Sequence, residues 1–182
     1  MATPSFNVDD KAAGAGRILR YQLNVLASTA EDVVQSAGGW LYDRARAGWD
    51  VNVFVAGGDP RPLVILGATA LDLEEGLLSM VRGASHGAAL AVSADLLGAD
   101  IRVRDEILRV LKHGLTEVTV WGTRWPAELG RQADSIQHGM SLAARAFKSY
   151  ALVAADAATD SVTPTETLFR VGTGSFRPLY SV

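Results

Sequence analysis

The sequence of 182 residues contains no cysteine, only three histidines and no long apolar run. The absence of cysteine excludes disulfides, thiolate zinc sites, iron–sulfur clusters and a cysteine nucleophile. No two histidines have the spacing of metal ligands, so we expect no metal site. Any catalysis would therefore have to depend on serine, threonine, aspartate and arginine side chains.

Membrane and export signals are also missing from the sequence. The longest apolar stretch, residues 63–71, is interrupted by Gly67 and Thr69 and is far shorter than the roughly 20 residues of a membrane-spanning helix. The first residues lack the basic region and apolar stretch of a secretory signal. We therefore expect a cytoplasmic location. The formal net charge of −3 argues against a protein that coats nucleic acid or anionic membrane.

What the sequence does contain is enough apolar material for one core. Hydrophobic residues make up 48% of the chain, and its length suits a single domain of roughly 100–200 residues. Residues 1–19 are small and polar and predict a flexible N-terminal arm. Residues 20–156 predict a single α/β domain. Residues 157–182 are rich in Thr and Ser and predict an extended tail, in which 167–171 and 176–180 could form two short strands.

Strand and helix patterns alternate along the predicted domain. This order predicts a layered α/β fold with a mostly parallel sheet of about five strands and flanking helices. The segment 62–66 either forms an antiparallel hairpin with 50–55 or leaves the main sheet, because about six residues separate them and a parallel crossover needs a dozen or more. Strands are expected at 21–27, 50–55, 62–66, 87–94 and 115–121, and helices between 28 and 48, from 72, at 100–113 and at 126–155.

The first predicted helix has a clear beginning and a weak middle. Ser28 and Glu31 have the spacing of a capping box, and Gly48 is expected to end the helix. Gly38 and Gly39 each cost about 1 kcal/mol relative to alanine. Their presence therefore indicates close packing of this helix on the sheet.

The longest helical pattern covers residues 126–155, and Gly130 and Gly139 leave open whether it is one helix with a bend or two helices. Its apolar residues recur in steps of three and four, which is typical of a seam between helices. The seam either packs on the protein's own sheet or forms a homodimer. The predicted interface residues are Leu129, Ile136, Met140, Phe147 and Tyr150. A basic stripe beside the seam either is solvated or meets an acidic partner, and it consists of Arg124, Arg131, His138, Arg145 and Lys148.

A candidate ligand site lies at the carboxyl ends of the predicted strands, where open α/β sheets bind ligands. Ser28 and Thr29 open a helix whose free amides favour an anion, and Arg124 would add a charged fork. Asp95 is the carboxylate expected to act as a base. In the plainer interpretation, the hydroxyls only cap helices and turns. The predicted ligand-binding residues are Ser28, Thr29, Thr69, Asp95, Thr123 and Arg124.

Three functions follow from these patterns. Because no phosphate-binding, dinucleotide-binding or hydrolase motif is complete, the sequence indicates no particular cofactor, and we favour a non-catalytic α/β domain for regulation or protein assembly, self-associating through the long helix. The first alternative is an enzyme or sensor that binds a nucleotide or another phosphorylated small molecule at the strand ends. The second is nucleic-acid binding through the basic stripe.

Overall fold

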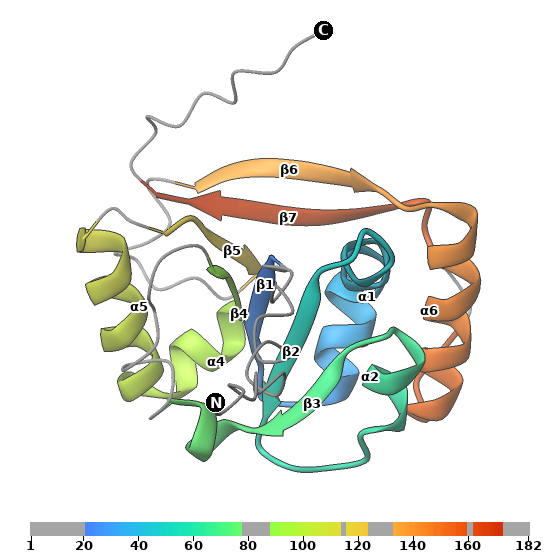
Figure 1. Cartoon of the computed structure of the whole chain (residues 1–182), viewed down its shortest axis with the longest axis horizontal. Helices are drawn as coiled ribbons and strands as arrows, with labels where there is room; N and C mark the ends of the chain where they lie inside the picture. Colours follow the sequence, from blue (N-terminus) through green and yellow to red (C-terminus); the bar gives the residue numbers. More distant parts are fainter. Residues whose placement is uncertain (1–20, 78–87, 114–115, 124–132, 160–161, 173–182) are drawn as a thin grey trace, which may run out of the picture.

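The computed structural model describes residues 21–77, 88–113, 116–123, 133–159 and 162–172. These residues form an α/β fold around a seven-stranded sheet with the order β3-β2-β1-β4-β5-β7-β6 (Figure 1). The α/β class is confirmed. The sheet is mixed, however, and has seven strands in place of about five mostly parallel ones.

Five of the strands run parallel. In the register of this part, Leu26 is aligned with Phe54 on one side and Val92 on the other. Because helices cover both faces, these strands are rich in apolar residues, as buried parallel strands usually are. Their carboxyl ends meet at one edge of the sheet. The five strands are β1 (Gln22–Leu26), β2 (Asp50–Val55), β3 (Thr69–Asp72), β4 (Ala88–Ser93) and β5 (Val118–Trp121).

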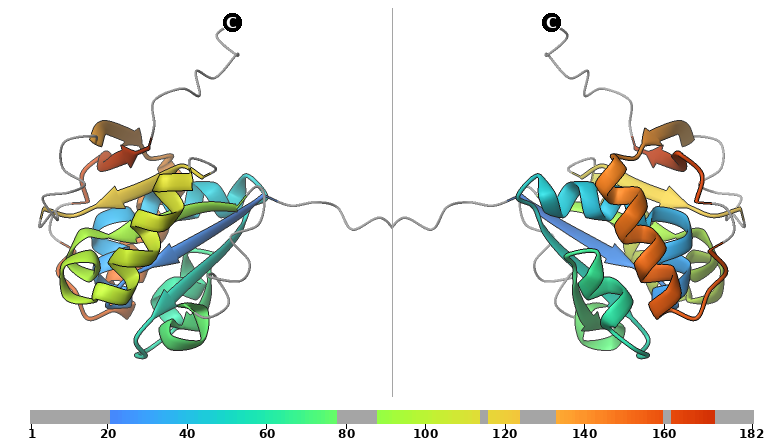
Figure 2. Two further views of the ribbon diagram at one scale, coloured as in Figure 1. Left: turned by 90° about the vertical axis from the view of Figure 1, so that its left-hand side faces the viewer. Right: turned by 90° about the vertical axis from the view of Figure 1, so that its right-hand side faces the viewer.

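The helices form two layers on opposite faces of the sheet (Figure 2). α1 (Ala30–Arg46), α2 (Arg61–Ile65) and α6 (Leu142–Ala154) pack on one face, around a core that includes Val25 and Leu41. α4 (Ala94–Ala99) and α5 (Ile101–His113) pack on the other face, around Val120 and Ile107. Each face thus has its own buried apolar cluster.

The segment 62–66 is helical and not a strand. Residues 62–65 lie in α2 and Leu66 is its C-cap, with Pro62 in the first turn, where the missing amide proton costs nothing. A short apolar run has the same composition in a buried strand and in a short helix, which is why the sequence misled here. The chain passes through α2 before β3, so β2 and β3 pair in parallel, with Asn52 opposite Thr69. The prediction of a hairpin between 50–55 and 62–66 was wrong. The alternative prediction, that 62–66 lies outside the sheet, is confirmed.

The long helix predicted for 126–155 was also wrong. Within its described part, residues 133–139 form the strand β6 (Ala133–Gly139), and only α6 is helical. Ser141 starts α6, because its Oγ accepts the backbone N–H of Ala144 at 3.0 Å. β6 pairs along its whole length with the antiparallel strand β7 (Thr165–Val171), which also pairs with β5. The strand predicted at 167–171 is therefore confirmed, inside the sheet.

The predicted seam and basic stripe do not lie on one helix. Ile136 and His138 belong to β6, and Met140 lies buried in the connection to α6. Phe147 and Tyr150 are on the exposed side of α6, whereas Lys148 is buried on its inner side. Several further predicted positions lie outside the described residues: Arg124, Leu129, Arg131, the arm 1–19 and the segment 176–180.

Candidate functional site

The carboxyl ends of β1, β4 and β5 meet at one edge of the sheet, and α1 and α4 begin there. Thr29 is the N-cap of α1, and its Oγ1 accepts the backbone N–H of Asp32 at 3.2 Å. The predicted capping box was therefore one residue early. Glu31, its predicted second member, accepts instead from the side chain of Gln35 at 3.0 Å.

A contact between α1 and β5 holds an acidic side chain at this edge. The indole N–H of Trp121, the last residue of β5, donates to both carboxylate oxygens of Asp32, at 3.2 and 3.3 Å. Trp121 is fully buried, so its position is fixed by the core. Ser36 Oγ donates to Asp32 Oδ1 at 3.3 Å from the next turn of α1. Asp32 is thus partly buried, oriented and close to the strand ends.

The edge is acidic where α1 begins. Glu31 and Asp32 both lie in the first turn of α1, where carboxylates complement the positive end of the helix dipole. This arrangement does not match the phosphate or nucleotide that the sequence suggested for this helix start.

The predicted ligand-binding residues are only partly brought together. Ser28 and Thr29 follow β1, Asp95 is exposed at the start of α4, and Thr123 is exposed just beyond β5. Thr69 opens β3 and is three residues from its carboxyl end, so the expectation that it follows a strand was wrong. Asp32 was not predicted. The available signal was a carboxylate in the first turn of a helix that directly follows a strand.

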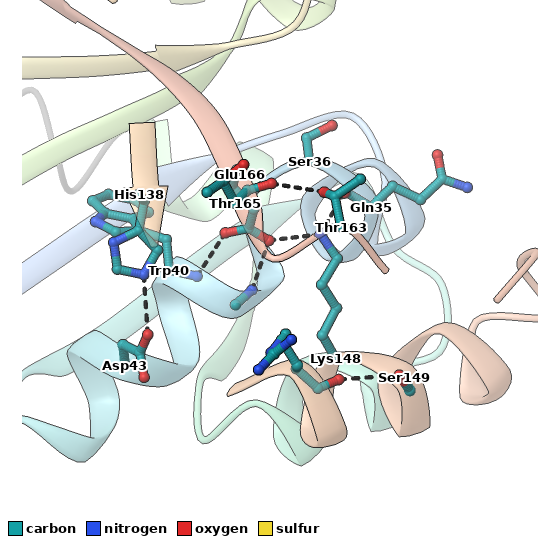
Figure 3. Close-up of polar contacts among 12 residues, drawn as sticks. Gln35, Ser36, Trp40, Asp43, His138, Lys148, Ser149, Thr163, Thr165 and Glu166 are labelled. Carbon is teal, nitrogen blue, oxygen red and sulfur yellow. Dashed lines mark hydrogen bonds and ion pairs between the residues drawn. The ribbon is translucent and has the colours of Figure 1, made fainter. Parts of the chain in front are cut away.

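A second polar region joins α1 to α6 and β7 on the same face of the sheet (Figure 3). The carboxylate of Glu166 accepts the backbone N–H groups of Gly39 and Trp40 at 2.8 and 2.7 Å. Lys148 Nζ donates to Glu166 Oε1 at 2.6 Å and to the carbonyl of Gln35 at 2.7 Å. In a regular helix the Gly39 amide would pair with that carbonyl. The ion pair therefore satisfies backbone groups in the middle of α1.

Gly39 makes this approach feasible. A Cβ atom at this position would lie 1.9 Å from the sulfur of Met140 and 3.3 Å from Glu166 Oε1. The two glycines do reflect close packing, as the sequence suggested. The tight contact is with Met140 and Glu166, which belong to the β6–α6 connection and to β7. It is not with the parallel strands.

Asp43 lies one turn further along α1. It contacts one residue on each side of the short connection between β6 and α6. Its carboxylate accepts from Ser141 Oγ at 2.7 Å and lies 3.0 Å from His138 Nε2. Burial alone would raise the pKa of Asp43, but the hydrogen bonds from Ser141 and His138 outweigh it and lower that pKa. Ser141 does not contact His138 in these bonds, so the three side chains are not arranged as a nucleophile, base and orienting acid.

A pocket of about 150 Å³ lies beside this region, between α1 and the strands β5, β7 and β6. Trp40, Leu168 and Ile136 give it an apolar wall, and Arg44 and Arg170 give it charge. Arg44 lies over the rings of Trp40 and Trp49, and Arg170 pairs with Glu117 at 2.6 Å. Both guanidinium groups are therefore engaged within the protein.

Within the ranges that the structure describes, no three His, Cys, Asp or Glu side chains are grouped so as to hold a metal ion. No helix in those ranges has both the length and the apolar character needed to cross a membrane.

No protein-family model matches this chain, and no curated protein matches its sequence. Several solved structures share its fold. A deacetylase of an antimicrobial pseudoaglycone superposes with a TM-score of 0.58 and 16% identity, over 87% of this chain and 100% of its own. A deacetylase in complex with teicoplanin gives 0.60 and 12% identity over 84% and 98%. The zinc-inhibited form of a teicoplanin deacetylase gives 0.55 and 12% identity over 82% and 97%.

These findings correct the predicted function. The solved structures reported above are all enzymes, so the prediction of a non-catalytic domain for regulation or protein assembly was wrong, as was the preference against an enzyme. The associated expectation of anion binding also conflicts with these deacetylase neighbours and with the acidic start of α1.

Proposed function

We propose that this chain is a hydrolase that removes an acetyl or similar short acyl group from a small molecule. The observation that carries the proposal is a fold in common with deacetylases, over 82–87% of this chain and 97–100% of theirs. Coverage of nearly the whole neighbouring chains means that the resemblance extends beyond one βαβ unit. The reaction class comes from these neighbours, and the residues that would carry it come from the geometry of this chain.

The proposed site is the edge where β1, β4 and β5 end, the usual position of ligands in open α/β sheets. Asp32 is the carboxylate that the structure orients there, through the indole N–H of the buried Trp121. A carboxylate held in this way is suited to accept a proton from a water molecule. Ser28 and Thr123, at the same edge, supply hydroxyl groups for binding the substrate.

The proposed reaction is the addition of water to the acyl carbon. Asp32 takes a proton as the water oxygen bonds to this carbon. The bond between the acyl carbon and the amine or alcohol then breaks, and the leaving nitrogen or oxygen receives the proton. The products are a free carboxylic acid and a deacylated amine or alcohol.

The test is acetate release from a panel of N-acetylated and O-acetylated small molecules by the purified chain. We expect hydrolysis of at least one member, and a loss of kcat of about a hundredfold or more in Asp32→Asn, because general-base catalysis contributes about that much. The matched control is Glu31→Gln, in the same turn of α1, which should retain activity. Binding without hydrolysis of any member, or full activity in folded Asp32→Asn, would contradict the proposal.

A further inference from the structure

The outer face of α6 is apolar along its whole length. Leu142, Tyr150 and Val153 are 77%, 66% and 67% exposed, and Phe147 is 40% exposed. None of the exposed residues of α6 is charged; they are Leu142, Ala143, Ala146, Phe147, Tyr150 and Val153. The opposite side packs on the core through Ala144, Lys148, Ala151 and Leu152.

The other long helix in the outer layers provides a comparison. The exposed residues of α5 include Arg102, Asp105, Arg109 and Lys112, the polar surface expected of a helix that faces water. α6 lies in the layer on the other side of the sheet, with its length along the outside of the molecule (Figure 2). A helix that faces outwards without charge is typical of a surface that binds another apolar surface.

Aromatic packing holds this face in place before any partner arrives. The Phe147 ring stacks on Tyr42 of α1 at 4.6 Å, and Tyr150 meets Phe147 edge to face at 6.4 Å. Tyr150 is therefore supported on one flank although most of it is exposed. A pre-positioned aromatic side chain loses less rotamer entropy on binding, which favours association.

The order of large and small residues identifies the occupant. We infer that the outer face of α6 binds the same face of a second copy, antiparallel and around a two-fold axis near residue 148. An isologous contact of this kind requires that a surface complement itself. In this register three of the four large exposed residues meet an alanine of the other copy: Tyr150 faces Ala146, Val153 faces Ala143, and Leu142 faces Ala154. The fourth, Phe147, faces the small residue Ser149.

The length of α6 sets the strength of the dimer. Its 13 residues span about 20 Å, so one helix pair forms an interface at the low end of the range, below about 1,200 Å² in total. Interfaces of this size are typical of weak, reversible complexes, so we expect monomer and dimer to exchange. The dimer does not depend on the proposed hydrolase activity.

The first test is sedimentation velocity of the full chain across a wide concentration range. We expect the average mass to rise from monomer towards dimer, and Tyr150→Glu to weaken the dimer at least about tenfold, because each dimer contains the charge twice. The control is Ile101→Glu, at an apolar residue of α5 with 60% exposure, which should dimerise like the native chain. A monomer at all concentrations, or a dimer that folded Tyr150→Glu leaves intact, would overturn the inference.

The second test uses the absence of native cysteine. A mixture of Ala146→Cys and Tyr150→Cys chains should form a mixed disulfide dimer under mild oxidation, because these positions face each other across the axis. A mixture of Ala146→Cys and Ile101→Cys should not. Equal cross-linking in the two mixtures would exclude the proposed register. This is the result expected if the ends of the chain or a lipid surface, and not a second copy, cover α6.

Discussion

The two parts of the sheet are joined to α1 by different forces. The parallel strands contact it through fully buried apolar residues such as Val25, Val53 and Ala91. The second part, which we name the β6-α6-β7 extension (residues 133–159 and 162–171), adds hydrogen bonds and an ion pair. The polar side chains that make them are Asp43, His138, Ser141, Lys148 and Glu166.

This difference determines how precisely each part is positioned. Apolar burial, which is non-directional, dominates the contact between the parallel strands and α1, and the hydrogen bonds from Trp121 to Asp32 are its directional part. The extension makes more directional contacts, and they are buried, because Glu166 must meet two backbone amides of α1 and Lys148 must meet a carbonyl in the same place. If any of these bonds fails, a buried charge or amide is left unsatisfied. Polar contacts therefore fix the register of the extension on α1.

The strongest way to break this comparison is to remove Glu166. Its side chain is only 2% exposed, and its loss leaves the Lys148 ammonium and two amides of α1 buried without their acceptor. We expect Glu166→Ala to lower the free energy of unfolding by about 3–5 kcal/mol. Urea titration followed by circular dichroism measures this value.

The control is an ion pair on the same strand that remains in water. Arg170 pairs with Glu117, and both side chains are about half exposed. Arg170→Ala should cost less than about 1 kcal/mol. If Glu166→Ala costs no more than Arg170→Ala, the extension is not held by its buried polar contacts, and the contrast between the two parts of the sheet fails.

A smaller effect is expected from adding one methyl group to α1. The new Cβ in Gly39→Ala would overlap Met140, and we expect a loss of about 1–3 kcal/mol in the free energy of unfolding. Gly38→Ala is the matched control, because its Cβ would come no closer than 3.3 Å, to Leu66, and alanine gains about 1 kcal/mol in helix propensity. In a chain that carries Met140→Ala, Gly39→Ala should cost less than it does in the native chain, because the overlapping side chain is gone. An equal cost in both backgrounds would mean that the strain lies elsewhere.

Four of the five parallel strands, all but β3, could be predicted from the sequence because their signals are local. Runs such as 50–55 and 87–94 are apolar or alternate, and each lies between residues typical of turns and helix starts. The strand ends, and with them Ser28 and Thr29, followed from these runs. The contact of Asp32 with Trp121 could not be predicted, because 89 residues separate them and only the packing of α1 on β5 brings them together.

The extension could not be predicted in the same way. β6 contains one large aliphatic residue, Ile136, and it is a strand because it pairs with β7. Its sequence fits a helical spacing equally well, and long-range pairing decides between the two. Lys148 was assigned to a basic stripe, either solvated or facing a partner, because its actual partner Glu166 lies on the strand β7. The one available signal was Glu166, a charged residue two positions before Leu168 and therefore on the same, inward side of β7.

The smallest effect that distinguishes the two parts is the pH dependence of the stability that the Asp43 side chain contributes. The pKa of Asp43 is lowered in the folded state. Its bonds to Ser141 and His138 therefore stabilise the protein at pH values above 3.8, the ordinary pKa of an aspartate, and this stabilisation is lost as the pH falls through the folded pKa. Asp43→Asn should therefore cost about 1 kcal/mol near pH 6 and progressively less below about pH 4. Urea titrations at intervals between these pH values measure the difference.

Asp105→Asn, at an exposed position of α5, is the control and should match the native chain throughout. A cost for Asp43→Asn that stays constant with pH would mean that the Asp43 side chain acts by shape alone, and that the polar docking of the extension rests on Glu166 and Lys148.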